Sequence, residues 1–113
     1  MTNQELEYRA LKILEMNPEL TQRQLAEALG ISLGKTHYLI KSLIKVGWVK
    51  LDNFQKSNNK WGYAYLLTPQ GIAEKATITA RFLIKKQREY NALKDEIAQL
   101  EAEVRSQSST FAK

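Results

Sequence analysis

The chain has 113 residues, of which 26% are charged, and its formal net charge is +5; it contains one histidine and no cysteine. This length suits one domain with an appended element, the lack of cysteine excludes disulfides and thiolate metal sites, and one histidine is too few for a histidine-rich metal site. No run of about 18 apolar residues exists and Met1 to Glu7 carry no apolar signal region, so we expect a soluble cytoplasmic protein without a membrane span, metal or cofactor.

The first predicted helix begins after Thr2 and ends at the Asn17-Pro18 pair. Thr2 and Glu5 have the spacing of a capping box, in which a hydroxyl and a carboxylate satisfy free backbone N–H groups. The residue before a proline avoids the helical region, which ends the helix there. Between these limits the apolar residues recur at helical spacing, at Leu6, Ala10, Ile13 and Leu14.

Two further helices follow with a very short connection. Thr21 and Gln24 form a second capping box, and Leu25, Ala28 and Leu29 are predicted to share one buried face. Gly30 stands where a left-handed residue ends a helix. Ser32 then caps a third helix that runs to about Val46, with Gly47 as its stop. Two helices joined by a Gly-Ile-Ser turn are typical of a helix-turn-helix.

Within the third helix, Gly34-Lys35-Thr36 has the letters that end a nucleotide-binding P-loop. That loop needs another glycine five residues before Gly34, and Leu29 stands there instead. The helical periodicity predicts a different role for the segment. Its buried face is centred on Ile40, and beside Ile40 we expect Leu33, Thr36, Leu43 and Ile44.

The opposite face of this helix is small, polar and basic. Its centre holds Gly34, Tyr38, Lys41 and Lys45, flanked by Lys35, His37 and Ser42. Such a face suits a DNA duplex, because ammonium groups bind phosphates and a tyrosine can contact base edges. Blander alternatives stay open: Tyr38 packs on a neighbouring element, His37 is a partly buried hydrogen-bonding residue, and Lys45 only offsets the helix dipole.

A β-hairpin is predicted next. Trp48 to Phe54 form a strand in which Val49 and Leu51 alternate with polar residues, and Tyr63 to Leu67 form its partner. The polar turn between them, residues 56–60, carries Lys56, Asn58, Asn59 and Lys60. Residues 32–60 hold six lysines against one aspartate and so account for the whole net charge. This concentration indicates a polyanionic partner such as nucleic acid, or else a solvated surface.

A long final helix begins with Thr68 as its cap and Pro69 at its first position, and nothing stops it before about Ser106. We therefore expect a domain at residues 1–68, a helix at 69–106 and a frayed tail at 107–113. Apolar residues recur at heptad spacing, which predicts a coiled-coil seam between two copies. The seam consists of Leu83, Tyr90, Leu93, Ile97, Leu100 and Val104. Folding of this helix onto its own domain is the alternative, and the direction of pairing stays open.

These elements describe a mainly α fold with a three-helix helix-turn-helix core, a two-stranded wing and a long C-terminal helix. The chain resembles the MarR-type transcriptional regulators in "LTQRQLAEALGISLGKTHYLIKSLIKVGWVK" and "LLTPQG". From Leu20 to about Ala92, with "FLIKKQREYNALKDEI" at its end, it is similar to the small MarR-like regulators associated with extracellular polysaccharide genes.

The resemblance implies that the third helix enters the major groove of double-stranded DNA and that the wing tip touches the minor groove or phosphates. The positions implied to contact DNA are Thr21, Gln22, Arg23, Ser32, Leu33, Gly34, Lys35, His37, Tyr38, Lys41, Lys56, Asn58, Asn59 and Lys60. Larger MarR-type proteins enclose an effector pocket with several terminal helices, whereas only one helix follows the wing here. A small-molecule effector is therefore doubtful.

The sequence thus predicts a homodimeric, sequence-specific regulator of transcription and not an enzyme. A winged-helix module that binds proteins is the main alternative, since some winged helices use their third helix for that purpose. Binding of structured RNA through the same basic surface is another. Salt-sensitive affinity for duplex DNA would distinguish the predicted regulator from both.

Overall fold

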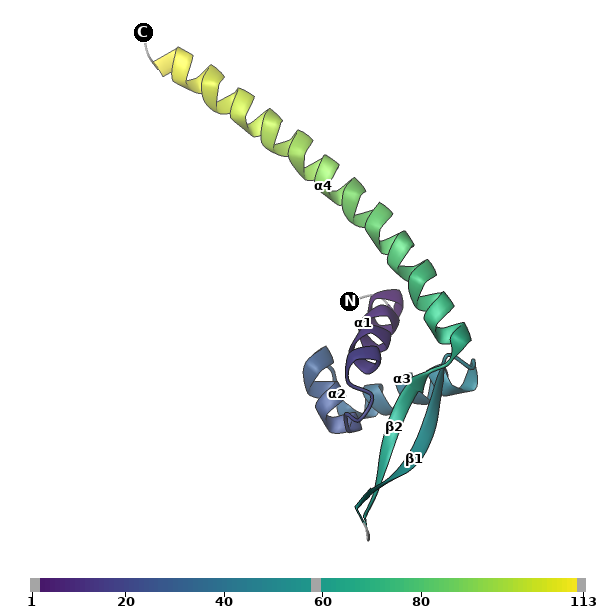
Figure 1. The fold of residues 1–113 in the computed structure, drawn as a ribbon. Coiled ribbons are helices and arrows are strands. Elements are labelled where there is room, and N and C mark those ends of the chain that lie inside the picture. Colours follow the sequence, from purple (N-terminus) through teal and green to yellow (C-terminus); the bar gives the residue numbers. More distant parts are fainter. Residues whose placement is uncertain (1–2, 58–59, 112–113) are drawn as a thin grey trace. The chain divides into compact units, whose positions relative to one another are not determined.

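The computed structural model describes residues 3–57 and 60–111. In chain order the elements are α1 (Asn3–Met16), α2 (Gln22–Leu29), α3 (Leu33–Lys45), β1 (Val49–Ser57), β2 (Lys60–Leu67) and α4 (Pro69–Phe111) (Figure 1). The chain divides into two units, the first ending at Thr79 and the second beginning at Ala80. The predicted fold class, mainly α with a two-stranded wing, is confirmed.

The ends of the first helices follow from local chemistry. α1 stops at Met16, just before the Asn17-Pro18 pair. At the start of α2, the Thr21 hydroxyl accepts a hydrogen bond from the Gln24 N–H (3.1 Å) and the Gln24 side chain accepts one from the Thr21 N–H (3.0 Å). This is the predicted capping box. The box expected at α1 depends on Thr2, which lies outside the described residues.

Gly30 ends α2 in the left-handed conformation, with φ of 71°. The N–H groups of Gly30 and Ile31 both donate hydrogen bonds to the carbonyl oxygen of Ala26, at 2.9 and 3.1 Å. This pairing satisfies carbonyls at the helix end that would otherwise lack donors. The chain can therefore turn at once into α3, which gives the short helix-turn-helix connection.

The core of the first unit lies where α1, α2 and α3 meet. Its large, fully buried side chains are Leu11, Leu14, Leu25, Leu29, Ile40, Leu43 and Val49. One prediction for α2 is wrong, since Ala28 is exposed and Ala26 is buried. The reason is that α2 contacts both α1 and α3, and their placement selects the flank of the helix that carries Ala26.

The buried stripe of α3 is narrower than predicted. Thr36, Ile40 and Leu43 are buried, but Leu33 is 45% exposed and Ile44 is 38% exposed. These two lie at the edges of the stripe, where the neighbouring elements no longer cover the helix. Thr36 is the one buried polar residue of α3 in the described part of the chain, and its hydroxyl donates to the Ser32 carbonyl (2.9 Å). Burial therefore leaves this hydroxyl satisfied.

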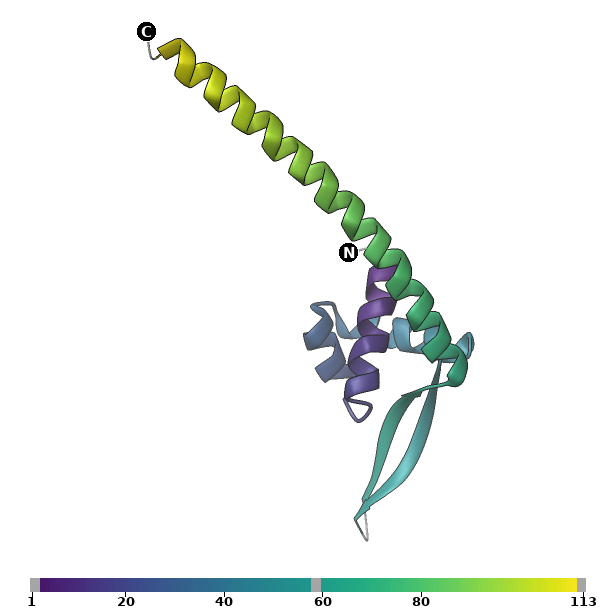
Figure 2. The same ribbon diagram turned by 45° about the horizontal axis from the view of Figure 1, so that its top comes forward.

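β1 and β2 form an antiparallel hairpin that leaves the helices of the first unit as a two-stranded ribbon (Figure 2). Val49 pairs with Leu67 and is buried at the base, whereas Leu51, which the alternation puts on the same apolar face as Val49, is 49% exposed. At that level it is β2 that meets the helices, since Tyr65, the partner of Leu51, bonds to Pro18 and to Gln22 of α2. The hairpin is also longer than predicted, because backbone pairing needs no apolar side chains. It continues to the pair of Ser57 and Lys60, with an irregularity after Gln55.

Several hydrogen bonds hold the chain where it passes from the wing into α4. The Thr68 hydroxyl donates to the Gly47 carbonyl and accepts from the Gly71 N–H (3.0 Å), so Thr68 caps α4 as predicted. The Thr68 N–H also donates to the Trp48 carbonyl (3.0 Å). These bonds join the end of α3, the start of β1 and the start of α4 at one point.

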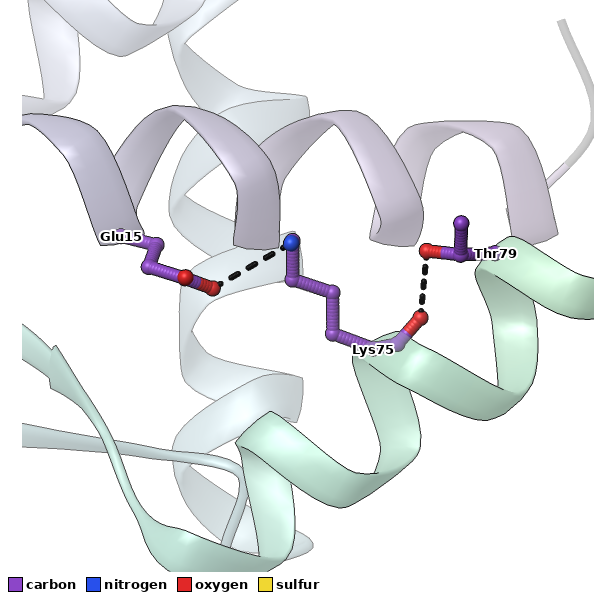
Figure 3. Close-up of polar contacts among 3 residues, drawn as sticks. All are labelled: Glu15, Lys75 and Thr79. Atoms are coloured by element: carbon purple, nitrogen blue, oxygen red, sulfur yellow. Dashed lines mark hydrogen bonds and ion pairs between the residues drawn. The ribbon is translucent and has the colours of Figure 1, made fainter.

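The first turns of α4 belong to the winged unit. Ile78 is buried, and the Lys75 ammonium lies 3.3 Å from the Glu15 carboxylate of α1 (Figure 3). In the same turn the Thr79 hydroxyl donates to the Lys75 carbonyl (2.7 Å). The unit that contains the wing thus ends at Thr79, later than the boundary expected at residue 68, because these contacts hold the helix start against α1.

From Ala80 onward, α4 continues to Phe111. The tail expected to fray from residue 107 is helical as far as Phe111, because neither glycine nor proline interrupts it. Over the described residues, no helix combines the length and apolar character needed to cross a bilayer.

Candidate nucleic-acid interface

The first turn of α3 is held by Ser32. The Ser32 hydroxyl accepts a hydrogen bond from the Lys35 N–H (3.1 Å), and the Ser32 carbonyl accepts from the Thr36 N–H (3.0 Å). These bonds fix the start of the helix and leave the outer face free of packing. The exposed residues on and beside that face are Gly34, Lys35, His37, Tyr38, Lys41 and Lys45.

Tyr38 is the most exposed aromatic side chain of this face, at 75%. Packing on a neighbouring element, the alternative left open by the sequence, would have covered it. Its ring and hydroxyl are instead available to a partner. Lys35 and Lys41 flank it at the helical spacing that puts neighbouring side chains side by side. The result is an aromatic group between two ammonium groups.

Gly34 has no packing reason to be a glycine. A Cβ built on it would meet nothing within 4 Å. Its backbone therefore lies open at the first turn of α3. A glycine at such a point permits close approach of a ligand to the backbone.

Several basic side chains lie on and beside this face of α3. Among the described residues, Lys35, Lys41, Lys45 and Lys50 form no ion pair. All four are exposed, as is Arg23 at the start of α2. Unpaired lysines on one helix and the adjoining strand supply the positive potential that attracts a polyanion.

The start of α2 meets α3 and the wing through Gln22. The Gln22 side-chain oxygen lies 3.1 Å from Nδ1 of His37, and its side-chain nitrogen donates to the Tyr65 hydroxyl (3.2 Å). Thr21 and Arg23 on either side are exposed. His37 thus makes the hydrogen bond anticipated in the alternative reading, yet its side chain stays exposed.

The structure describes the predicted wing-tip contacts only in part. Asn58 and Asn59 lie outside the described residues, and so do the side chains of Lys56 and Lys60. Their backbones place Lys56 in β1 and Lys60 in β2, whereas the sequence predicts a turn there. Their role in DNA binding stays a prediction.

The contacts of two residues near this surface were not predicted from the sequence. Tyr65 holds Gln22, and Arg9 of α1 donates to the carbonyls of Ala28 (3.0 Å) and Leu29 (3.3 Å) at the end of α2. A cation at the C-terminus of a helix stabilises it by satisfying free carbonyls. No periodic pattern links residues so far apart in the chain, so neither contact had a signal in the sequence.

Comparison with known proteins identifies this arrangement. Residues 4–50 match a family model described as winged helix-turn-helix DNA-binding. The first unit is a winged helix-turn-helix domain. The description is that of a DNA-binding module and not of an enzyme, which agrees with the expectation from the sequence. No curated protein sequence matches the chain significantly.

Solved structures with the same winged helix-turn-helix fold include MarR-type regulators. A mutant of MepR from Staphylococcus aureus is 21% identical over 98% of this chain and 80% of its own, with a TM-score of 0.62. A MarR/EmrR family transcriptional regulator from Acinetobacter is 18% identical over 92% of this chain and 75% of its own, with a TM-score of 0.58. MarR from E. coli is 21% identical over 64% of this chain and 52% of its own, with a TM-score of 0.53.

At these identities the likeness shows the fold. The winged helix-turn-helix fold predicted from the sequence is thereby confirmed. This chain spans about half the length of E. coli MarR. The narrower resemblance to regulators associated with extracellular polysaccharide genes stays a prediction.

Proposed function

We propose that the protein is a homodimeric regulator of transcription that binds specific sites in double-stranded DNA in a bacterial cytoplasm. The observation that carries the proposal is the outer face of α3 in the winged helix-turn-helix. It presents Lys35, Tyr38 and Lys41 exposed and without ion pairs among the described residues. Exposed ammonium groups on both sides of an exposed aromatic ring suit a polyanionic partner with base edges to contact.

In this proposal α3 enters the major groove. Lys35 and Lys41 bind phosphates or base edges, Tyr38 and His37 contact base edges, and Gly34 lets the backbone approach the duplex. The N-terminus of α3 adds partial positive charge near a phosphate. Ser32 and Leu33 lie at the start of α3 and contact DNA beside its first turn. Supporting contacts to the sugar–phosphate backbone come from the start of α2 and the wing tip, that is, from Thr21, Gln22, Arg23, Lys56, Asn58, Asn59 and Lys60.

Dimerisation is proposed through the second unit. The side chains of the predicted seam, Leu83, Tyr90, Leu93, Ile97, Leu100 and Val104, are between 45% and 64% exposed. Contiguous apolar surface of this kind usually marks an interface. A second copy of the helix suits it, because the heptad spacing brings the same side chains of both copies into one seam.

A dimer carries two copies of α3, related by a two-fold axis. Such a protein reads two half-sites related by the same symmetry, so the operator should be an inverted repeat. The regulated genes are proposed, on the narrower resemblance alone, to include extracellular polysaccharide genes. No effector molecule is part of the proposal.

Selection of genomic fragments tests this function. Purified full-length protein is mixed with sheared bacterial DNA at roughly physiological salt, where non-specific phosphate binding is weak, and the retained fragments are sequenced. Enrichment of a few sites with two-fold symmetry supports a dimeric regulator and identifies its genes. Equal retention of all fragments contradicts sequence-specific binding and leaves a non-specific binder, whereas retention of no fragment favours a protein-interaction module. A parallel selection with structured RNA tests the alternative of RNA binding through the same surface.

A further inference from the structure

A chain of hydrogen bonds joins three elements at the edge of the proposed DNA interface. Nδ1 of His37 on α3 lies 3.1 Å from the side-chain oxygen of Gln22 on α2, and the side-chain nitrogen of Gln22 donates to the Tyr65 hydroxyl on β2 (3.2 Å). The three side chains differ in exposure. Gln22 and Tyr65 are half-buried, whereas His37 is exposed.

The direction of the bond to Gln22 indicates which nitrogen of the imidazole carries a proton. With the amide oriented as in the structure, its oxygen faces the imidazole and can only accept, so Nδ1 of His37 carries the proton in this bond. In a neutral imidazole the other nitrogen, Nε2, is then an acceptor. Within the described part of the chain, Nε2 has no hydrogen-bond partner. The ring thus has an acceptor free for a ligand.

The amide of Gln22 is itself held in place. Its nitrogen faces the Tyr65 hydroxyl, and the backbone N–H of Tyr65 donates to the carbonyl of Pro18, 2.8 Å away, in the loop before α2. Gln22 is the first residue of α2, and the capping box of Thr21 and Gln24 fixes the backbone there. A rotated amide would instead donate to Nδ1 and accept from the Tyr65 hydroxyl, which requires the Nε2–H tautomer, so the tautomer of His37 reports the orientation of this amide.

We propose that Gln22 and Tyr65 are positioning residues that hold His37 in the Nδ1–H tautomer, so that its Nε2 accepts a hydrogen bond from the amino group of a cytosine or an adenine in the major groove. This inference rests on the proposed function. Cytosine N4 and adenine N6 are the amino donors that the major groove offers, whereas guanine and thymine present acceptors there. A neutral His37 held in this way therefore discriminates against guanine and thymine at one position of each half-site.

The tautomer can be measured without DNA. His37 is the single histidine of the chain, so its two ring nitrogens give an unambiguous ¹⁵N NMR spectrum of the full-length protein. The spectrum is recorded at a pH high enough that it no longer changes with pH. The expected result is a proton on Nδ1. A proton mainly on Nε2 overturns the proposal.

Two variants identify what holds the ring. In Gln22→Leu, which removes both hydrogen bonds, the proton should move mainly to Nε2, the tautomer that an unconstrained histidine favours. In Tyr65→Phe, which removes only the distant hydroxyl, a smaller shift toward Nε2 is expected. An unchanged tautomer in Gln22→Leu overturns the positioning role. If that variant does not fold, the spectrum of the wild-type protein still decides whether Nδ1 carries the proton.

The contact to DNA is tested by replacing His37 with amides of two lengths. In His37→Asn the amide lies near the position of Nδ1, so it can still bind Gln22 but cannot reach the base. In His37→Gln the amide extends to the position of Nε2. We expect His37→Asn to lose the preference for cytosine or adenine at that position, a change of about five- to tenfold in relative affinity for one hydrogen bond, and His37→Gln to retain part of it.

The base preference is read by repeating the binding selection with every base at each position of the selected site. An unchanged preference in His37→Asn overturns the proposed base contact. These outcomes separate the two proposals. If the wild-type protein binds no DNA sequence specifically, the proposed function is contradicted. The NMR measurement tests the tautomer of His37 independently, because it uses no DNA.

Discussion

The carbonyl oxygen of Trp48 occupies the space that a side chain on residue 71 would need. A Cβ built on Gly71 would lie 1.9 Å from this oxygen. The start of α4 therefore lies directly against the turn between α3 and β1, at the point where Thr68 also bonds to Gly47. This relationship explains why a glycine follows the Thr-Pro start of the helix, where alanine would favour the helix more.

Gly71→Ala should destabilise the winged unit by about 1–3 kcal/mol, because the methyl group forces the start of α4 away from Trp48. The intrinsic gain from alanine in a helix is at most about 1 kcal/mol, so the clash should dominate. Thermal or urea unfolding at a fixed protein concentration measures the effect. Equal stability of variant and wild type would contradict the close contact.

Gly34→Ala is the matched control for this substitution. It adds the same methyl group to a helical glycine whose surroundings are empty within 4 Å, so the free energy of unfolding should rise by up to about 1 kcal/mol. The same substitution is expected to weaken DNA binding. If the duplex approaches the backbone at Gly34, the affinity falls while the stability rises.

Lys41→Ala should weaken binding to the selected DNA sites. A contact to a base edge predicts a loss of about 1–3 kcal/mol confined to the specific site, and a contact to a phosphate predicts a similar loss for all sequences with a salt dependence reduced by about one ion. Titrations at several salt concentrations distinguish the two. Lys12→Ala, on α1 and outside the proposed interface, is the control. Unchanged affinity in Lys41→Ala would remove this face of α3 from the interface.

Ile97→Asp combined with Leu100→Asp should convert a dimer into monomers, because each copy would then bring two buried charges into the seam. The winged unit does not contain these residues, so its near-ultraviolet circular dichroism should persist. Light scattering measures the mass in solution. Gln99→Asp with Ala102→Asp adds the same charge beside the seam and should leave the dimer intact. A double variant that stays dimeric would show that the interface lies elsewhere.

Glu7 gives a pH-dependent prediction. Burial raises the pKa of this carboxyl above its ordinary value, so the folded protein holds the proton to higher pH than the unfolded chain does. The contribution of Glu7 to stability is therefore most favourable below the ordinary pKa and is lost as the pH rises through the raised one. Glu7→Gln, which stays neutral, should be more stable than the wild type at pH 7 and lose that advantage in acid.

Unfolding at a series of pH values measures this difference. Glu27→Gln, which changes an exposed carboxylate of α2, is the control for removal of one negative charge. If both variants show the same pH dependence relative to the wild type, the burial of Glu7 has no bearing on stability.

Local chemistry alone predicts most of the element ends. The capping box at Thr21, the left-handed Gly30 and the Thr68-Pro69 start each act within one or two turns of chain, so the residues that decide them are neighbours in sequence. The same holds for the polar, basic outer face of α3, since a period of 3.6 residues separates it from the core. The fold class and most of the candidate interface were predictable for this reason.

Other features depend on contacts between distant segments. The burial of Ala26 in place of Ala28 and the exposure of Leu33 and Leu51 depend on where the neighbouring elements end and at what angle they pack. A helical period defines a face but not its width or its exact centre.

The bonds of Gln22 to His37 and to Tyr65 join residues 15 and 43 positions apart. The contact between Gly71 and Trp48 likewise joins residues that the whole wing separates in the sequence. The sequence by itself determined the helices, the wing and the basic face, because those follow from each residue and its near neighbours. Only the tertiary structure decided how His37 is held and where the winged unit ends, because both depend on side chains that folding brings together from separate elements.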